Sequence, residues 1–250
     1  SANGKKVLLL FFNRTITKTI RYGLRENDNI TVSTFHSFAK RRIEETDKAW
    51  WVNAKVDIKN QDEFWNIEVP IKLFEIPILE KYDAIIVDEG QDFISEWYEY
   101  LDEILKDKSE GNFCVFLDEK QDIFKHWSGI PWEMKPFRKH LTKNCRNTKK
   151  IVEYLEELSS STMVPYQNSP IGSDIVFRKI KGQDDEQKKI IEDIKELINQ
   201  NDILPGDIIL LSNLPKNESC LSNCKKIGKH DLLALGDRYD TRSTAIQYTS

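Results

Sequence analysis

Short apolar runs alternate with helical stretches along the first part of the chain. Residues 5–12 contain an apolar run bounded by polar positions, which predicts a strand buried on both faces. Apolar residues recur at every fourth position over 15–24, the spacing of a helix that buries one face. A second, β-branched strand is predicted at 30–35 and a second helix at 37–45. This order favours a mainly parallel sheet with crossover helices.

The alternation resumes after a less regular segment. Residues 46–81 hold clustered tryptophans and phenylalanines, which predict a small insert packed by aromatic rings. Strands are then expected at 85–87 and 113–117, with a helix at 95–106 between them and Ser95 as its N-cap.

Polar residues with Pro and Gly at 159–173 predict a domain boundary. The elements expected around it are a β-like segment at 141–146 with a helix to about 158, strands at 175–180, 208–212 and 245–249, a helix at 184–199, and a loop at 215–230. We therefore expect a first domain over 1–160 and the start of a second over 172–250.

Composition indicates a globular protein with 39% hydrophobic and 31% charged residues. No apolar run approaches the roughly 20 residues of a membrane helix, and no secretion signal is evident, so a cytoplasmic protein is expected. The net charge of −4 excludes a basic field over the whole chain but leaves room for a local basic groove. Cys220 and Cys224 lack the second ligand pair of a zinc site, and Cys114 is expected in the core.

Acidic residues follow two of the predicted strands. Asp88, Glu89 and Asp92 come directly after 85–87, and Asp118 follows 113–117. The carboxyl ends of parallel strands share the edge at which open α/β sheets bind ligands. An Asp at this edge can bind hydrated Mg²⁺, and a neighbouring Glu can polarise a water. The alternative for this segment is a solvated acidic turn.

Amide and guanidinium groups accompany these acids. Gln91 and Gln121 each follow the Asp of their strand by three residues, and a Gln amide can orient a water or contact a phosphate oxygen. Arg146 precedes a predicted helix and could stabilise charge on a transferring phosphoryl group. For Arg146 by itself, the alternative is a surface ion pair.

Five segments, in this order, resemble motifs of the UvrD/Rep-type superfamily 1 helicases. They are 7–24 (VLLLFFNRTITKTIRYGL, motif Ia), 34–39 (TFHSFA, motif Ib), 88–92 (DEGQD, motif II, the Walker B element), 116–124 (FLDEKQDIF, motif III) and 141–148 (LTKNCRNT, motif IV). The resemblance implies a RecA-like P-loop NTPase fold, ATP and Mg²⁺ as cofactors, and ATP-driven movement on single-stranded DNA. Nothing in the residues separates DNA from RNA.

The resemblance also implies roles for individual residues. Asp88 would hold Mg²⁺, Glu89 would activate the attacking water, and Gln121 would sense the γ-phosphate. Arg146 would act as an arginine finger, with Gln91 and Asp118 near the nucleotide. The residues expected along the single strand are Phe12, Asn13, Thr34, Phe35 and His36, and, after the motif III glutamine, Phe124 with His126 or Trp127. Core packing is the alternative for Phe12, Phe35 and Phe124.

One element of the family is missing from these 250 residues. A P-loop needs G-x4-G-K-[ST] to cradle the phosphates, and the sequence has no such run. Residues 245–250 resemble the strand that leads into motif V. We therefore expect an internal fragment of a longer helicase, inactive by itself as an ATPase.

Two other function classes stay open. One is a non-catalytic nucleic-acid-binding or scaffold module that kept the fold without the P-loop. The other is a two-metal nuclease built on Asp88, Glu89, Asp92 and Asp118, which would not need Gln91, Gln121 or Arg146.

Overall fold

The computed structural model describes residues 4–24, 28–56, 58, 60–109, 112–118, 139–159, 163–200, 203–234 and 245–249. The chain forms two compact units, residues 1–138 and 139–250. The structural division falls before the segment 159–173 in which the sequence predicts a domain boundary. Among the described residues, no helix is both long and apolar enough to cross a membrane.

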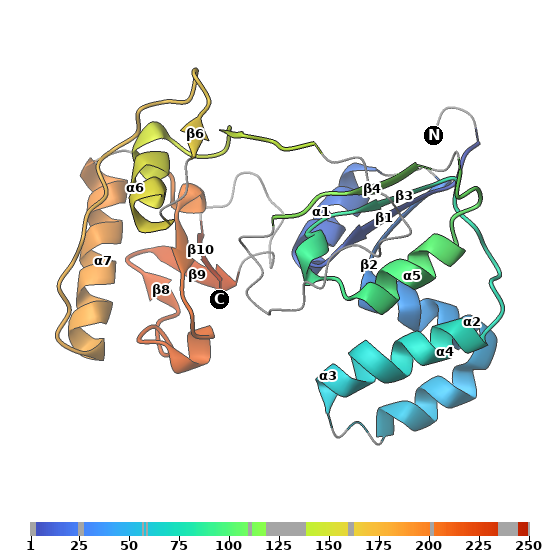
Figure 1. Cartoon of the computed structure of the whole chain (residues 1–250). Helices are drawn as coiled ribbons and strands as arrows, with labels where there is room; N and C mark the ends of the chain where they lie inside the picture. The colour runs from blue at the N-terminus through green and yellow to red at the C-terminus, as the bar shows by residue number, and fades with distance from the viewer. Residues whose placement is uncertain are drawn as a thin grey trace. The chain divides into compact units, whose positions relative to one another are not determined.

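The first unit is built on a parallel four-stranded sheet (Figure 1). Its strands are β1 (Val7–Phe11), β2 (Ile30–Thr34), β3 (Ala84–Val87) and β4 (Asn112–Val115), in the order β2-β1-β3-β4. Every pairing in this sheet is parallel. The predicted α/β fold with a mainly parallel sheet flanked by helices is therefore confirmed.

Helices lie on both faces of this sheet. They are α1 (Arg14–Gly23), α2 (Phe35–Val56) and α5 (Ser95–Glu103). Across the sheet, the connection from β1 to β2 moves toward one edge, whereas the connections from β2 to β3 and from β3 to β4 move toward the other edge. Right-handed crossovers therefore place α1 on one face and α2 with α5 on the other (Figure 1). Leu8, Leu10, Ile85 and Val87 are fully buried in the core.

The segment that follows β2 is more helical than predicted. α2 continues to Val56, and α3 (Gln61–Glu63), η1 (Phe64–Glu68) and α4 (Val69–Glu75) return the chain toward β3. At Asp47 the backbone leaves the helical region, with φ −145° and ψ 69°. The Asp47 carboxylate accepts a hydrogen bond from Trp50 N at 2.9 Å and pairs with Lys72 Nζ at 2.8 Å. Asp47 therefore caps a second helix that begins inside α2.

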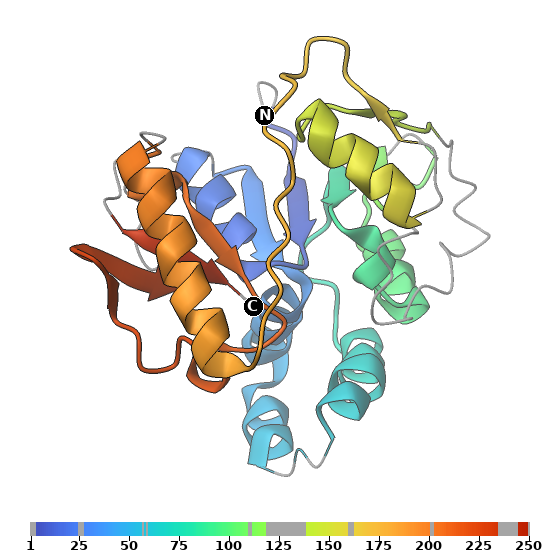
Figure 2. The ribbon, with the colours of Figure 1, turned by 90° about the vertical axis from the view of Figure 1, so that its left-hand side faces the viewer.

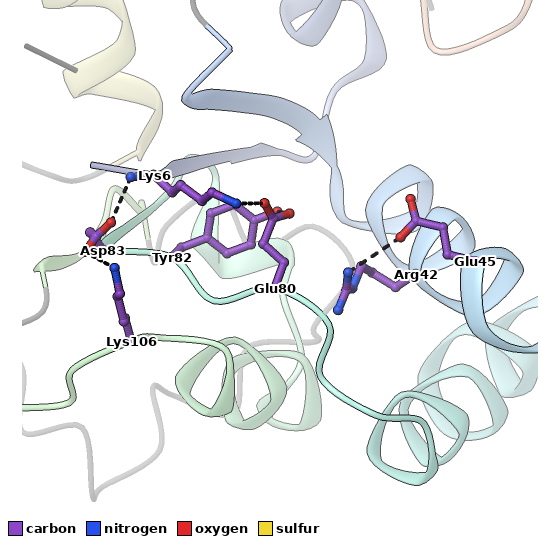
Figure 3. A network of polar contacts seen from close by, with 7 residues as sticks. All are labelled: Lys6, Arg42, Glu45, Glu80, Tyr82, Asp83 and Lys106. Atoms are coloured by element: carbon purple, nitrogen blue, oxygen red, sulfur yellow. Dashed lines mark hydrogen bonds and ion pairs between the residues drawn. The ribbon is translucent and has the colours of Figure 1, made fainter. Parts of the chain in front are cut away.

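A polar network ties the amino ends of β1 and β3 together (Figure 3). Lys6 Nζ pairs with Glu80 at 2.6 Å, and the Lys6 backbone N–H donates to Asp83 at 2.8 Å. Tyr82 Oη donates to Glu80 at 2.9 Å. The Lys6 ammonium holds the pKa of Glu80 below its ordinary value, and burial raises the pKa of Tyr82 to about 12. This network lies at the end of the sheet opposite the predicted acidic edge.

The second unit has a smaller mixed sheet covered by one long helix (Figure 2). The sheet order is β7-β10-β9-β8, in which only β8 and β9 pair antiparallel. The elements of this unit are β5 (Lys143–Asn144), α6 (Lys149–Ser159), β6 (Val164–Pro165), α7 (Gln183–Gln200), η5 (Pro205–Asp207), β7 (Ile209–Leu211), η6 (Lys216–Glu218), β8 (Lys226–Ile227), β9 (His230–Ala234) and β10 (Ile246–Thr249).

The prediction of a strand at 175–180 is wrong. The segment is extended, but it pairs with no strand of the described residues. It runs along α7 instead, where Arg178 pairs with Asp193 at 2.8 Å (Figure 2). The ring of Phe177 contacts Tyr154 of α6, with 5.5 Å between the ring centres, but is 69% exposed. Side-chain contacts to two helices thus take the place of sheet hydrogen bonds.

Candidate functional site

The carboxyl edge of the first sheet gathers most of the described candidate residues. In the strand register Phe11 lies beside Thr34, and Leu10 beside Val87. The segments that follow these positions therefore leave the sheet at one edge. They are Phe12–Asn13, Thr34–His36, Asp88–Asp92 and, after β4, Asp118.

The acidic turn after β3 has an unusual backbone. Asp88 still follows the sheet, since its N–H donates to Leu10 O at 2.9 Å. Glu89 has φ 54° and ψ 49°, and it is the only non-glycine residue with positive φ among the described residues. This left-handed conformation costs a side-chain-bearing residue about 1–2 kcal/mol. Gly90–Asp92 then form the short turn η2.

Close packing at Gly90 holds this turn in place. A Cβ at Gly90 would lie 2.4 Å from Val115 Cγ1 and 2.6 Å from Tyr98 Oη. Gly90 N donates to Phe116 O at 2.9 Å, while Gly90 O accepts from Tyr98 Oη at 2.7 Å. Burial raises the pKa of Tyr98, so its hydroxyl stays a donor. The close neighbours leave no room for a side chain at position 90, so only glycine fits there. The left-handed backbone conformation of this turn lies at the neighbouring Glu89.

The Gln91 side chain joins the ends of two strands. It is 2% exposed, its Nε2 donates to Glu89 Oε2 at 2.7 Å, and its Oε1 accepts from Asp118 N at 3.0 Å. Both ends of the amide are thus engaged with the protein. In this structure Gln91 orients the Glu89 carboxylate, and its contact with a nucleotide stays a prediction.

The acids at this edge supply oxygen ligands of the kind that Mg²⁺ prefers. Asp88 and Glu89 are half-buried and Asp118 is exposed. No group of three metal-ligating side chains occurs within the described part of the chain. Mg²⁺ at nucleotide sites uses one or two carboxylates and takes further ligands from phosphates and water, so these residues fit a metal that arrives with a nucleotide. The two-metal nuclease alternative gains no support.

An aromatic cluster flanks the acidic turn on the β1 and β2 side. The His36 ring packs nearly perpendicular to the rings of Trp65 and Trp97, with 4.2 Å and 5.1 Å between ring centres, and its centre lies 6.5 Å from that of the Phe12 ring. Burial, together with the Arg14 guanidinium, lowers the pKa of His36 from 6.5 to about 4. At neutral pH this half-buried imidazole is therefore uncharged. Asn13 is exposed, and its Oδ1 accepts from Ile16 N at 3.4 Å.

Two of the residues predicted to lie along nucleic acid are buried. Phe35 is 1% exposed, and its ring stacks on Trp97 at 4.2 Å. Thr34 is 3% exposed, and its Oγ1 accepts from Ser37 N at 3.2 Å, which caps the start of α2. The position of Phe35 matches the core-packing alternative. These two residues support the segment that presents His36.

Arg146 lies in the second unit, on the exposed turn between β5 and α6. Its N–H donates to Asn144 Oδ1 at 3.1 Å, and the same oxygen accepts from Asn147 N at 3.0 Å. Asn144 therefore shapes the turn that carries the guanidinium. The remaining candidates, Gln121, Phe124, His126 and Trp127, lie outside the described residues.

Three further residues at the site were not predicted. Tyr98 holds the acidic turn, Trp65 brings the insert against His36, and Arg14 affects the charge of His36. A sequence signal exists only for Arg14, which directly follows Phe12 and Asn13. Tyr98 and Trp65 approach through tertiary packing, which periodicity does not encode.

Comparison with models of protein families and with curated protein sequences finds no match to this chain.

Proposed function

We propose that this chain is part of an ATP-dependent motor that moves on single-stranded nucleic acid, with single-stranded DNA as the track. In this proposal the first unit is a RecA-like motor domain of a UvrD/Rep-type superfamily 1 helicase, acting in the cytoplasm. The observation that carries the proposal is the strained acidic turn at the carboxyl edge of a parallel sheet, where Glu89 is held in the left-handed conformation. Strained backbone of this kind clusters at functional sites.

The geometry supports a division of labour among the acids. Mg²⁺–ATP, when bound, would supply the phosphoanhydride and a cation that screens its charge. Asp88, which continues β3, would hold the cation through a carboxylate oxygen. Glu89 would orient and deprotonate the attacking water, and Gln91 fixes that carboxylate from a buried position. The bond from Asp118 N to Gln91 couples the turn to the end of β4.

The same edge supports contact with a nucleic-acid strand. Phe12 and His36 are half-buried aromatic rings beside the exposed Asn13 and Arg14. Rings stack on bases without regard to sequence, at about 1–3 kcal/mol per base, and a guanidinium contacts phosphate. Because the lowered pKa leaves His36 uncharged at neutral pH, its ring can stack on a base with no change of charge near that pH.

The test compares ATP hydrolysis with oligonucleotide binding in the natural full-length gene product. We expect hydrolysis that a single-stranded oligonucleotide stimulates and that Glu89→Gln abolishes. The matched control is Glu96→Gln, which removes an exposed carboxylate on α5 of the same unit. Oligonucleotide binding should survive both changes.

A non-catalytic nucleic-acid-binding module is the competing function. Absence of hydrolysis from the full-length product, with oligonucleotide binding intact, would favour that module. Absence of both activities would refute the motor and the module together.

A further inference from the structure

A polar hollow lies beside β2, at the outer edge of the first sheet. It has a volume of about 410 Å³ and is lined by α1, β2 and α2. Two arginines, Arg21 and Arg41, and three hydroxyl residues, Thr31, Ser33 and Ser37, line it. The other lining residues are apolar, and no carboxylate is among them.

The exposed edge of β2 positions the first arginine. β2 is the outermost strand of the sheet, so one row of its backbone groups faces outward. Arg21 reaches from α1 to this row, and its Nη2 donates to Val32 O at 2.5 Å. A guanidinium has five N–H donors, and this bond uses one of them. The bond fixes the planar group at the wall of the hollow.

The second arginine is held only weakly. Arg41 is exposed on α2, and its ion pair with Glu45 is long, at 3.8 Å, with both side chains 46% exposed. Exposed pairs of this kind contribute little and yield to a better acceptor. The Arg41 guanidinium also lies 5.8 Å from the centre of the Phe38 ring, which orients its stem. Arg41 can therefore turn to a ligand without breaking a strong interaction.

Hydroxyl groups complete a donor set. Thr34 Oγ1 donates to Ser37 Oγ at 2.9 Å, which directs the Ser37 hydrogen away from Thr34. Two guanidinium forks and a hydroxyl donor, with no acid among the lining residues, suit a tetrahedral oxyanion, since arginine binds phosphate through paired N–H bonds.

We infer that this hollow binds a phosphate group, and that the group is a phosphodiester of the strand contacted by the neighbouring site. This rests on the proposed function. The position supports the choice of ligand, because Ser33 and Ser37 flank the segment Thr34–His36, which ends β2 and begins α2. The volume also exceeds that of a phosphate ion, and the apolar part of the lining gives room to an attached sugar.

The test measures binding of a fluorescent oligothymidylate to the 250-residue chain by anisotropy over a range of salt. Arg21→Gln/Arg41→Gln should weaken binding about tenfold or more. It should also lower the slope of log K against log salt by about 0.7 for each phosphate that the protein no longer neutralises. Arg41→Gln changes only an exposed side chain and should shift both quantities in the same direction. The control Lys48→Gln/Lys81→Gln removes the same charge from exposed positions elsewhere in the unit and should keep the slope.

A second arm adds inorganic phosphate and follows the arginine Nε–H signals by NMR. Oligonucleotide binding that both arginine variants leave unchanged would overturn the phosphate site while the proposed function stands. Arginine-dependent phosphate binding without any oligonucleotide binding would support the site as one for a free phosphate and would contradict the proposed function. Absence of both kinds of binding would overturn both.

Discussion

Between pH 7 and pH 5, acidification should destabilise the first unit mainly through His36, because the lowered pKa values of Glu80 and Asp83 act at lower pH. The pKa of His36 is about 4 in the folded state because the ring is buried, against an ordinary 6.5. The unfolded chain therefore takes up a proton first, so stability is complete above pH 6.5 and falls as the pH drops toward 4. At 1.36 kcal/mol per pK unit, the loss between pH 7 and pH 5 is about 2 kcal/mol. Partial solvent access to the ring reduces the expected figure to about 1–2 kcal/mol.

Denaturant unfolding at pH 7 and pH 5 measures this loss. Tryptophan fluorescence reports on the first unit, because all six tryptophans lie within residues 1–138. His36→Phe keeps a ring without a titrating proton and should remove most of the pH dependence. His140→Phe, at an exposed position of the second unit, should leave it unchanged. An equal loss in wild type and His36→Phe, or an NMR titration of His36 near 6.5, would refute the reasoning.

Three other substitutions and one activity assay test the acidic turn. Gly90→Ala forces a Cβ against Val115 and should lower the free energy of unfolding by about 1–3 kcal/mol. Gly23→Ala is the control, since no atom lies within 4 Å of its new Cβ, and it should raise the free energy of unfolding by roughly 0.5–1 kcal/mol. Thermal melts of the two variants measure both changes. Tyr98→Phe removes a buried hydrogen bond and should cost about 1–3 kcal/mol in the same assay, and an unchanged melting temperature would contradict the role given to its hydroxyl. Gln91→Ala removes the amide that donates to the Glu89 carboxylate. It should lower the free energy of unfolding by about 1–3 kcal/mol, measured by chemical denaturation. The 250-residue chain should not hydrolyse ATP, since it has no phosphate-cradling loop, and a Mg²⁺-dependent turnover that Glu89→Gln abolishes would disprove this.

The parallel sheet could be predicted from the sequence because its strands are short apolar runs between helical patterns. The positions of the acids followed from the same pattern, since Asp88 directly succeeds β3 and Asp118 comes three residues after the end of β4. The conformation of the turn could not be predicted. A turn containing Gly favours positive φ at the glycine, yet here Glu89 adopts it, while Gly90 is needed because Val115 and Tyr98 leave no room for a side chain.

Other differences also come from tertiary context. The second helix was predicted over 37–45 with a less regular insert after it, but the cap at Asp47 starts a further helix at once. α5 begins at Ser95 itself, so Ile94 and not Ser95 occupies the N-cap position. Cys114 was expected in the core and is exposed, because β4 is an edge strand on which only Phe113 and Val115 face the packed side. None of these outcomes is contained in local periodicity.

The break at Asp47 divides the first unit into the sheet with its crossover helices and a helical segment that follows the break. Before Asp47, α2 packs its buried residues Phe38, Ala39 and Ile43 into the core. After it, the helices to Glu75 form a subdomain whose junction is held by the Asp47 carboxylate, with Trp50 N and Lys72 as its partners. The two parts still share one core, because Trp51, Phe64 and Leu73 after the break belong to the same buried cluster as the sheet residues Leu8 and Leu10. A change in the helices after Asp47 would therefore reach the candidate site through Trp65, which packs on His36 and whose carbonyl oxygen accepts a hydrogen bond from Trp97.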